Sequence, residues 1–246
     1  MRLRHDDPVA AAVVRAIHDG DLDALQDLLR DHPGLAAAWI EGPRGGARTP
    51  LMSAADWPGF FPNGAKVVAA LLVAGADPND RGEAKDGTPG NEGPLHWAAS
   101  SDDAEVAAAL IDGGADIDAP NGSIGTPLAN AVGYGCWQVA DLLVARGAKV
   151  DLLWVAAALG IMSAVEGFFA AQPAPTREEI DHAFWQACNG GQPRAAAYLL
   201  ARGADIHWMP DYAKQSALEI AKAHGSTRWG ILVDWLKMQG ETTGQG

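Results

Sequence analysis

The sequence is poor in positive charge and has no segment that would carry the chain into a membrane. Lys and Arg number 18 against 31 Asp and Glu, which gives a formal net charge of −13. A surface this acidic repels phosphate backbones and anionic lipid headgroups, so we expect neither nucleic acid nor a membrane as a partner. No uninterrupted apolar run is long enough to span a bilayer, and the first residues lack an apolar segment of signal-peptide length. We therefore expect a soluble, cytoplasmic protein.

Cysteine and the common catalytic motifs are also scarce. The two cysteines, Cys136 and Cys188, lie far apart and give neither a disulfide framework nor a metal-site spacing. They are typical of small buried residues in a reducing compartment. The sequence has no G-x-S-x-G, H-E-x-x-H, Walker or G-x-G-x-x-G motif. Its glycine-rich stretches, 87–93 and 190–192, lack the strand–loop–helix context of a phosphate-binding loop. We expect no cofactor and no metal.

What the chain has in abundance is apolar residues, 48% of the total, and internal repetition. The tripeptide Gly-Ala-Asp occurs at residues 75–77, 114–116 and 203–205, with the near copy Gly147-Ala148-Lys149. A pair of large apolar residues precedes each copy by a few positions. Counted with two further apolar positions, successive pairs are 43, 39, 33, 25 and 31 residues apart, at Leu28, Leu71, Leu110, Leu143, Phe168 and Leu199. A period near 33 residues is typical of a helical repeat protein.

The residues around each repeat predict where its helices begin and end. Thr49-Pro50 and Thr126-Pro127 each open an alanine-rich segment. Threonine caps a helix start, and a proline at the first helical position lacks only an N–H that would have no partner. The glycine of each Gly-Ala-Asp copy is expected to end the second helix in a left-handed conformation.

Two segments carry a resemblance to a known family. P-L-H-W-A-A-S-S-D-D-A-E-V-A-A-A-L-I-D-G-G-A-D-I-D-A at 94–119 and T-P-L-A-N-A-V-G-Y-G-C-W-Q-V-A-D-L-L-V-A-R-G-A at 126–148 resemble ankyrin repeats of the bacterial type. The resemblance covers nearly the whole chain. It implies an all-α solenoid of about seven helix–turn–helix units with short β-hairpin connections. The units form one domain over residues 1–246, with an N-terminal cap at about 8–40, repeats at about 45–207 and a C-terminal cap at about 208–240. It also implies a monomeric protein-binding module.

The chain departs from the family pattern at three places. An insertion, D-W-P-G-F-F-P at 56–62, lengthens the turn between two helices, and a second insertion at 81–93 enlarges a connecting hairpin. Between Asp151 and Trp154 the hairpin is almost missing. In an ankyrin stack the hairpin tips line one end of the concave groove and the turns between helices approach the other. We therefore expect the two insertions to bracket the groove of units one to three from opposite ends.

The first insertion places three large aromatic residues, Trp57, Phe60 and Phe61, in a stretch that cannot be helical. One hypothesis is that they form a lip over the groove and anchor a ligand, because aromatic residues are enriched at binding hot spots. The alternative is that the loop folds back and covers the N-terminal cap unit. The sequence leaves both open.

Further contact residues are predicted at the groove-facing helix ends and in the last hairpin. They are Asp56, Trp97, Ser100, Ser101, Asp102, Tyr134, Asn189, Trp208 and Tyr212. Trp97 has an alternative role in core packing, Trp208 is expected to be exposed, and the polar residues have an alternative role as solvated helix ends. The predicted ligand is a neutral or basic segment of a partner protein on the concave face.

The runner-up is a small-molecule pocket or enzyme under the 56–62 insertion, next to the first helices of repeats one to three. Asp56, His96 and Asp102 could converge there and perform acid–base chemistry. The resemblance gives His96 a different role, a hydrogen bond to the hairpin backbone. We lean against an enzyme.

Overall fold

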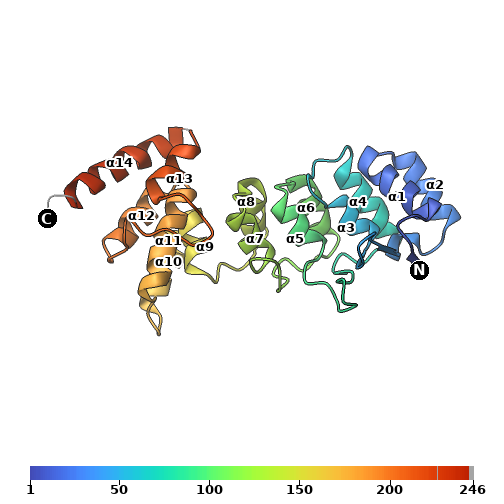
Figure 1. Ribbon diagram of the computed structural model, residues 1–246, viewed down its shortest axis with the longest axis horizontal. Coiled ribbons are helices and arrows are strands. Elements are labelled where there is room, and N and C mark those ends of the chain that lie inside the picture. The colour runs from blue at the N-terminus through green and yellow to red at the C-terminus, as the bar shows by residue number, and fades with distance from the viewer. Residues whose placement is uncertain (226, 244–246) are drawn as a thin grey trace. The chain divides into compact units, whose positions relative to one another are not determined.

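The computed structural model of the protein describes residues 1–225 and 227–243 (Figure 1). These residues contain fourteen α-helices, which follow one another as seven pairs, the number that the repeats predict. The chain divides into an N-terminal unit, Met1–Lys149, and a C-terminal unit, Val150–Gly246. The division falls where the sequence has almost no hairpin. The prediction of a single domain stays a prediction.

The N-terminal unit consists of four helix pairs in two layers. In each pair the two helices are antiparallel neighbours, and the first helices pack on one another in sequence, as do the second helices. The first helices are α1 (Pro8–Asp19), α3 (Pro50–Ala54), α5 (Pro94–Ser100) and α7 (Pro127–Gly133). The second helices are α2 (Leu22–Asp31), α4 (Gly64–Val73), α6 (Ala104–Asp112) and α8 (Trp137–Ala145), and a short 3₁₀ helix, η1 (Leu35–Ala37), follows α2.

The C-terminal unit repeats this arrangement with three pairs. Its helices are α9 (Leu153–Leu159), α10 (Met162–Ala170), α11 (Arg177–Asn189), α12 (Pro193–Leu200), α13 (Ala217–Ala223) and α14 (Thr227–Thr243). Helix α11 packs between α9 and α13, and α12 contacts both α10 and α14. Phe184 and Trp185 are the largest side chains of its core, and leucines such as Leu199, Leu232 and Leu236 pack with them.

The helix boundaries follow the predicted local chemistry. Thr49 and Thr126 accept hydrogen bonds from the N–H groups of Met52 and Ala129, and a proline follows each threonine. The glycines at 75, 114, 147 and 203 all have φ between 91° and 95°, a left-handed conformation that other residues adopt only with strain. The alanines of α3, α5, α7, α9 and α11 are almost fully buried, which allows neighbouring pairs to pack closely.

A small sheet joins the N-terminus to the first connection. Its strands are β1 (Arg2–Leu3), β2 (Trp39–Glu41) and β3 (Ala47–Arg48), in the order β1-β2-β3, with β1 parallel and β3 antiparallel to β2. Single bridges from Ala47 to Glu83 and from Glu83 to Pro89 extend the pairing into the 81–93 insertion.

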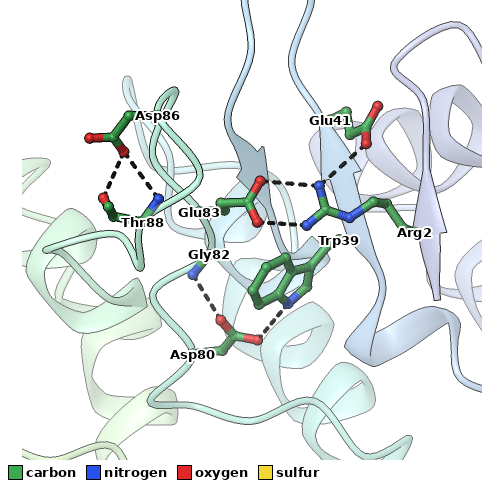
Figure 2. A network of polar contacts seen from close by, with 8 residues as sticks. All are labelled: Arg2, Trp39, Glu41, Asp80, Gly82, Glu83, Asp86 and Thr88. Carbon is green, nitrogen blue, oxygen red and sulfur yellow. Dashed lines mark hydrogen bonds and ion pairs between the residues drawn. The ribbon is translucent and has the colours of Figure 1, made fainter.

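Polar contacts attach this second insertion to the sheet (Figure 2). The guanidinium of Arg2 forms ion pairs with Glu41 at 3.3 Å and with Glu83 at 2.7 Å. Trp39 donates its indole N–H to Asp80 at 3.0 Å, and the other oxygen of Asp80 accepts the N–H of Gly82 at 2.8 Å. The 81–93 insertion is therefore attached to the sheet through Glu83 and through the contacts of Asp80.

Candidate functional site

A cavity of about 200 Å³ lies along the exposed side of α5, and we call it the α5 cavity. Six residues that the sequence predicted as contacts line it: Asp56, Trp57, Trp97, Ser100, Ser101 and Tyr134. Glu92 and Ser123 complete the lining, and the sequence prediction missed both. The α5 cavity thus gathers predicted residues from three consecutive helix pairs.

Both insertions contribute to the α5 cavity. Asp56 and Trp57 come from the first insertion, which follows α3, and Glu92 comes from the end of the second, just before α5. Helix α5 places Trp97 and Ser100 between them. Tyr134 follows the C-terminal end of α7. Side chains of the two insertions therefore line the same cavity beside this short helix.

The aromatic walls of the cavity remain accessible. Trp57 is 79% exposed and Tyr134 is 54% exposed, whereas Trp97 is half-buried. The guanidinium of Arg48 lies 4.6 Å from the centre of the Trp97 ring and forms an ion pair with Asp56 at 2.8 Å. The other carboxylate oxygen of Asp56 accepts the N–H of Trp57 at 2.8 Å. Asp56 is thus neutralised within the protein, and it also orients the backbone of Trp57.

A polar network forms the opposite wall. One oxygen of Glu92, Oε1, accepts the N–H of Ser123 and the amide Nδ2 of the buried Asn130, both at 2.8 Å. The Ser123 hydroxyl is 3.1 Å from the hydroxyl of Tyr134. Burial raises the pKa of Glu92, but these hydrogen bonds outweigh it, so the pKa of Glu92 lies below its usual value. Glu92 is therefore ionised at neutral pH.

The first insertion divides its three aromatic residues between two roles. Phe61 stacks on His18 of α1, with ring centres 4.3 Å apart, and the next polar residue, Asn63, donates its amide to the carbonyl of Gly20 at 3.0 Å. Phe60 is 64% exposed and faces a separate cavity of about 240 Å³. The lip that was expected from all three residues together is therefore limited at the α5 cavity to Trp57. The alternative hypothesis, in which the loop covers the first helix pair, fits the position of Phe61.

Asp103 fixes the exposed half of this insertion. Its carboxylate accepts the N–H of Phe60 at 2.7 Å and the N–H of Val106, in the first turn of α6, at 3.1 Å. Only 4% of Asp103 is exposed. One buried carboxylate thus caps the helix of one repeat and holds the insertion of the repeat before it.

Asp56, His96 and Asp102 do not form the acid–base group that the runner-up hypothesis expected. His96 is buried, accepts the N–H of Gly93 through Nδ1 at 3.3 Å, and donates from Nε2 to the carbonyl of Ala119 at 3.1 Å. Burial lowers the pKa of His96, so its imidazole is neutral.

Asp102 acts elsewhere, because its carboxylate accepts the N–H of Val139 at 3.0 Å in the first turn of α8. The three polar groups are each bound to different partners. The role that the resemblance gave His96, a bond to the hairpin backbone, is the one observed.

The remaining predicted contacts lie in the C-terminal unit. Tyr212 is exposed, and its hydroxyl lies 2.8 Å from Nε2 of His182 and 3.1 Å from the Gln186 amide. Trp208 was expected to be exposed but is half-buried, because its ring packs beside His182. Asn189 is buried, and its side-chain amide bonds to Gln186 and His224. Of these three, Tyr212 alone presents a large accessible surface.

The described residues also form cavities away from α5. A cavity of about 770 Å³ lies between α1 and the loop that joins β2 to β3, and small residues and the ends of exposed charged side chains line much of it. In the part of the chain that the structure describes, no three His, Cys, Asp or Glu side chains are grouped as metal ligands. Both cysteines are buried, as expected, and burial raises the pKa of the Cys136 thiol to about 11. Across the described residues, none of the helices has the length and apolar character to cross a membrane.

The comparisons with known proteins agree with the helix pairs. The family model for ankyrin repeats (3 copies) matches residues 60–153, which include α4 to α8 and the end of the first insertion. No curated protein matches the chain. Ankyrin repeats stack into solenoids, and they are in general protein-interaction modules. Residues 60–153 are ankyrin repeats, and the described helices on either side continue the same all-α helix pairs.

Proposed function

We propose that this protein is a binding module and that a neutral or basic segment of a partner protein lies along the exposed side of α5. In this proposal that surface is the groove-facing one of the repeats, and the protein acts as a monomer in the cytoplasm. The observation that carries the proposal is that the α5 cavity gathers six predicted contact residues, from both insertions and from α5 and α7. Residues far apart in the sequence thus share one accessible surface.

The exposed rings are the proposed source of affinity. An aromatic side chain that becomes buried at an interface removes roughly 150–250 Å² from water. At about 25 cal/mol per Å², a fully covered ring contributes a gross 4–6 kcal/mol, and the ordering of both partners offsets part of this. Trp57 has the most area to lose, since 79% of it is exposed. Its ring is therefore the expected anchor, and Tyr134 is the second.

The charge of the surface selects the partner. The chain has a formal net charge of −13, and Glu92 brings an ionised carboxylate to the α5 cavity. An acidic surface speeds the encounter with basic segments and repels acidic ones. The proposed ligand is accordingly neutral or basic.

The test is co-purification of the tagged, full-length protein from its native cells, with the Trp57→Ala and Val73→Ala variants beside the wild type. Val73 is a matched control, because it is 91% exposed and lines none of the cavities described above. We expect Trp57→Ala to weaken the complex by about 2 kcal/mol or more, or roughly thirtyfold, without unfolding the protein. Val73→Ala should leave the complex intact. Equal recovery of the partner by both variants would contradict the proposal.

A further inference from the structure

The α5 cavity contains a carboxylate that no cation neutralises. The two short hydrogen bonds to Glu92 both fall on Oε1, from Ser123 and Asn130. Within the described residues, no Lys, Arg or His forms an ion pair with Glu92, so Oε2 has no cationic partner. The side chain is partly withdrawn from water. The hydrogen bonds to Oε1 keep this carboxylate ionised, so a negative charge without a cation partner lines the cavity, where a ligand cation can pair with it.

The same surface already binds one cation from within the protein. The guanidinium of Arg48 lies over the ring of Trp97 and pairs with the carboxylate of Asp56. A ring face and a carboxylate together attract a cation, through the quadrupole of the ring and through direct charge pairing. Glu92, with the accessible rings of Trp57 and Tyr134, supplies these two components a second time.

The size of the cavity limits what can enter it. Its volume of about 200 Å³ lies below the roughly 300–1,000 Å³ of pockets that enclose a small-molecule ligand. A single long side chain therefore fits better than a whole metabolite.

We propose that the α5 cavity receives the cationic end of one Lys or Arg side chain from the partner. In this arrangement the ammonium or guanidinium pairs with Glu92, and the rings of Trp57, Trp97 and Tyr134 surround its methylene stem. An apolar side chain at the same place would cover the Glu92 carboxylate without pairing it. The inference rests on the proposed function, since it names the residue that the partner segment must carry.

The test uses three short peptides of identical glycine–serine sequence, with a central lysine, arginine or norleucine. Binding to the full-length protein is followed by NMR through the indole N–H signals of Trp57 and Trp97, assigned by single Trp→Phe variants. We expect the lysine and arginine peptides to shift these signals with affinities about tenfold higher than the norleucine peptide. About 0.5 M NaCl should remove most of this difference, since it shortens the screening length to a few ångströms. Either cationic peptide alone would support the proposal and would identify the residue.

Two variants assign the effect to Glu92. Glu92→Gln removes the charge while its amide oxygen can still accept the bonds from Ser123 and Asn130, so the cation preference should disappear and the melting temperature should hold. Glu105→Gln is the matched control, because it removes one negative charge from an exposed site that faces a different cavity. It should keep the full preference. If Glu92→Gln fails to fold, the wild-type comparison of the three peptides still decides.

The proposal is overturned if the norleucine peptide binds as tightly as the other two, or if no peptide moves the Trp57 and Trp97 signals. Either result leaves the proposed function standing when Trp57→Ala still abolishes recovery of the partner. The module would then bind through its aromatic rings alone. If Trp57→Ala also has no effect on the partner, the proposed function fails with it.

Discussion

Replacing Asp103 by alanine removes two hydrogen bonds, one within its own repeat and one to the insertion of the preceding repeat. The first caps α6 through Val106, and loss of a helix cap costs about 1 kcal/mol. The second holds the N–H of Phe60 at 2.7 Å, and a hydrogen bond to a charged acceptor contributes about 1.5–3 kcal/mol. We therefore expect Asp103→Ala to lower the free energy of unfolding by about 3 kcal/mol.

The assay is urea denaturation followed by tryptophan fluorescence and by far-UV circular dichroism, since repeat proteins do not always unfold in one step. Asp21→Ala is the matched control, because Asp21 caps α2 through Ala24 and makes no second contact of this kind. We expect it to cost about 1 kcal/mol. If Asp103→Ala costs no more than Asp21→Ala, the first insertion is not held by Asp103 and the reasoning is refuted.

Three further predictions concern the first insertion, helix α10 and the buried His96. Phe61→Ala should destabilise the fold by about 2–3 kcal/mol through the lost stack on His18, whereas Trp57→Ala should barely change the melting temperature. A larger loss of stability in Trp57→Ala than in Phe61→Ala would contradict the different roles assigned to these two residues of the insertion. Helix α10 buries only Val165 and has no side-chain cap, so in hydrogen exchange it should open before α6, and equal protection would be contrary evidence. Burial lowers the pKa of His96 below the usual 6.5, so the unfolded chain binds the proton more tightly than the folded protein does. Stability should therefore be full above pH 6.5 and fall as the pH drops below that value. Urea denaturation at several pH values should show a smaller fall in His96→Asn.

The repeats could be predicted because their signals are local. A Thr-Pro pair, an alanine run and a glycine after an apolar pair each act within a few residues, so Thr49, Thr126 and the left-handed glycines behave as expected. His96 could be assigned to the hairpin backbone for the same reason. Where the repeat pattern is unbroken, the sequence predicts both the helix and the residues at which it begins and ends.

The site could be predicted only in part, because it depends on how the two insertions fold. The contact between Phe61 and His18 joins residues 43 positions apart, and nothing in D-W-P-G-F-F-P distinguishes Phe61 from Phe60. Glu92 was missed because it looks like one polar residue of a loop. A signal did exist, since a charged residue two positions before the proline of α5 must lie at the N-terminal end of that helix.

The insertion that follows α3 has an anchored half and an exposed half, and the anchored half holds the exposed half in position for binding. Phe61, Asn63 and the bond from Asp103 to the Phe60 N–H fix the backbone after Gly59, while Asp56 accepts the N–H of Trp57 on the other side. A ring presented by a fixed backbone loses little conformational freedom when a partner covers it, since ordering a loop costs about 1–2 kcal/mol per residue. Asp103→Ala should therefore weaken partner binding as well as stability, even at temperatures where the repeats remain folded. Unchanged binding by a folded Asp103→Ala protein would mean that Trp57 is positioned without the anchor.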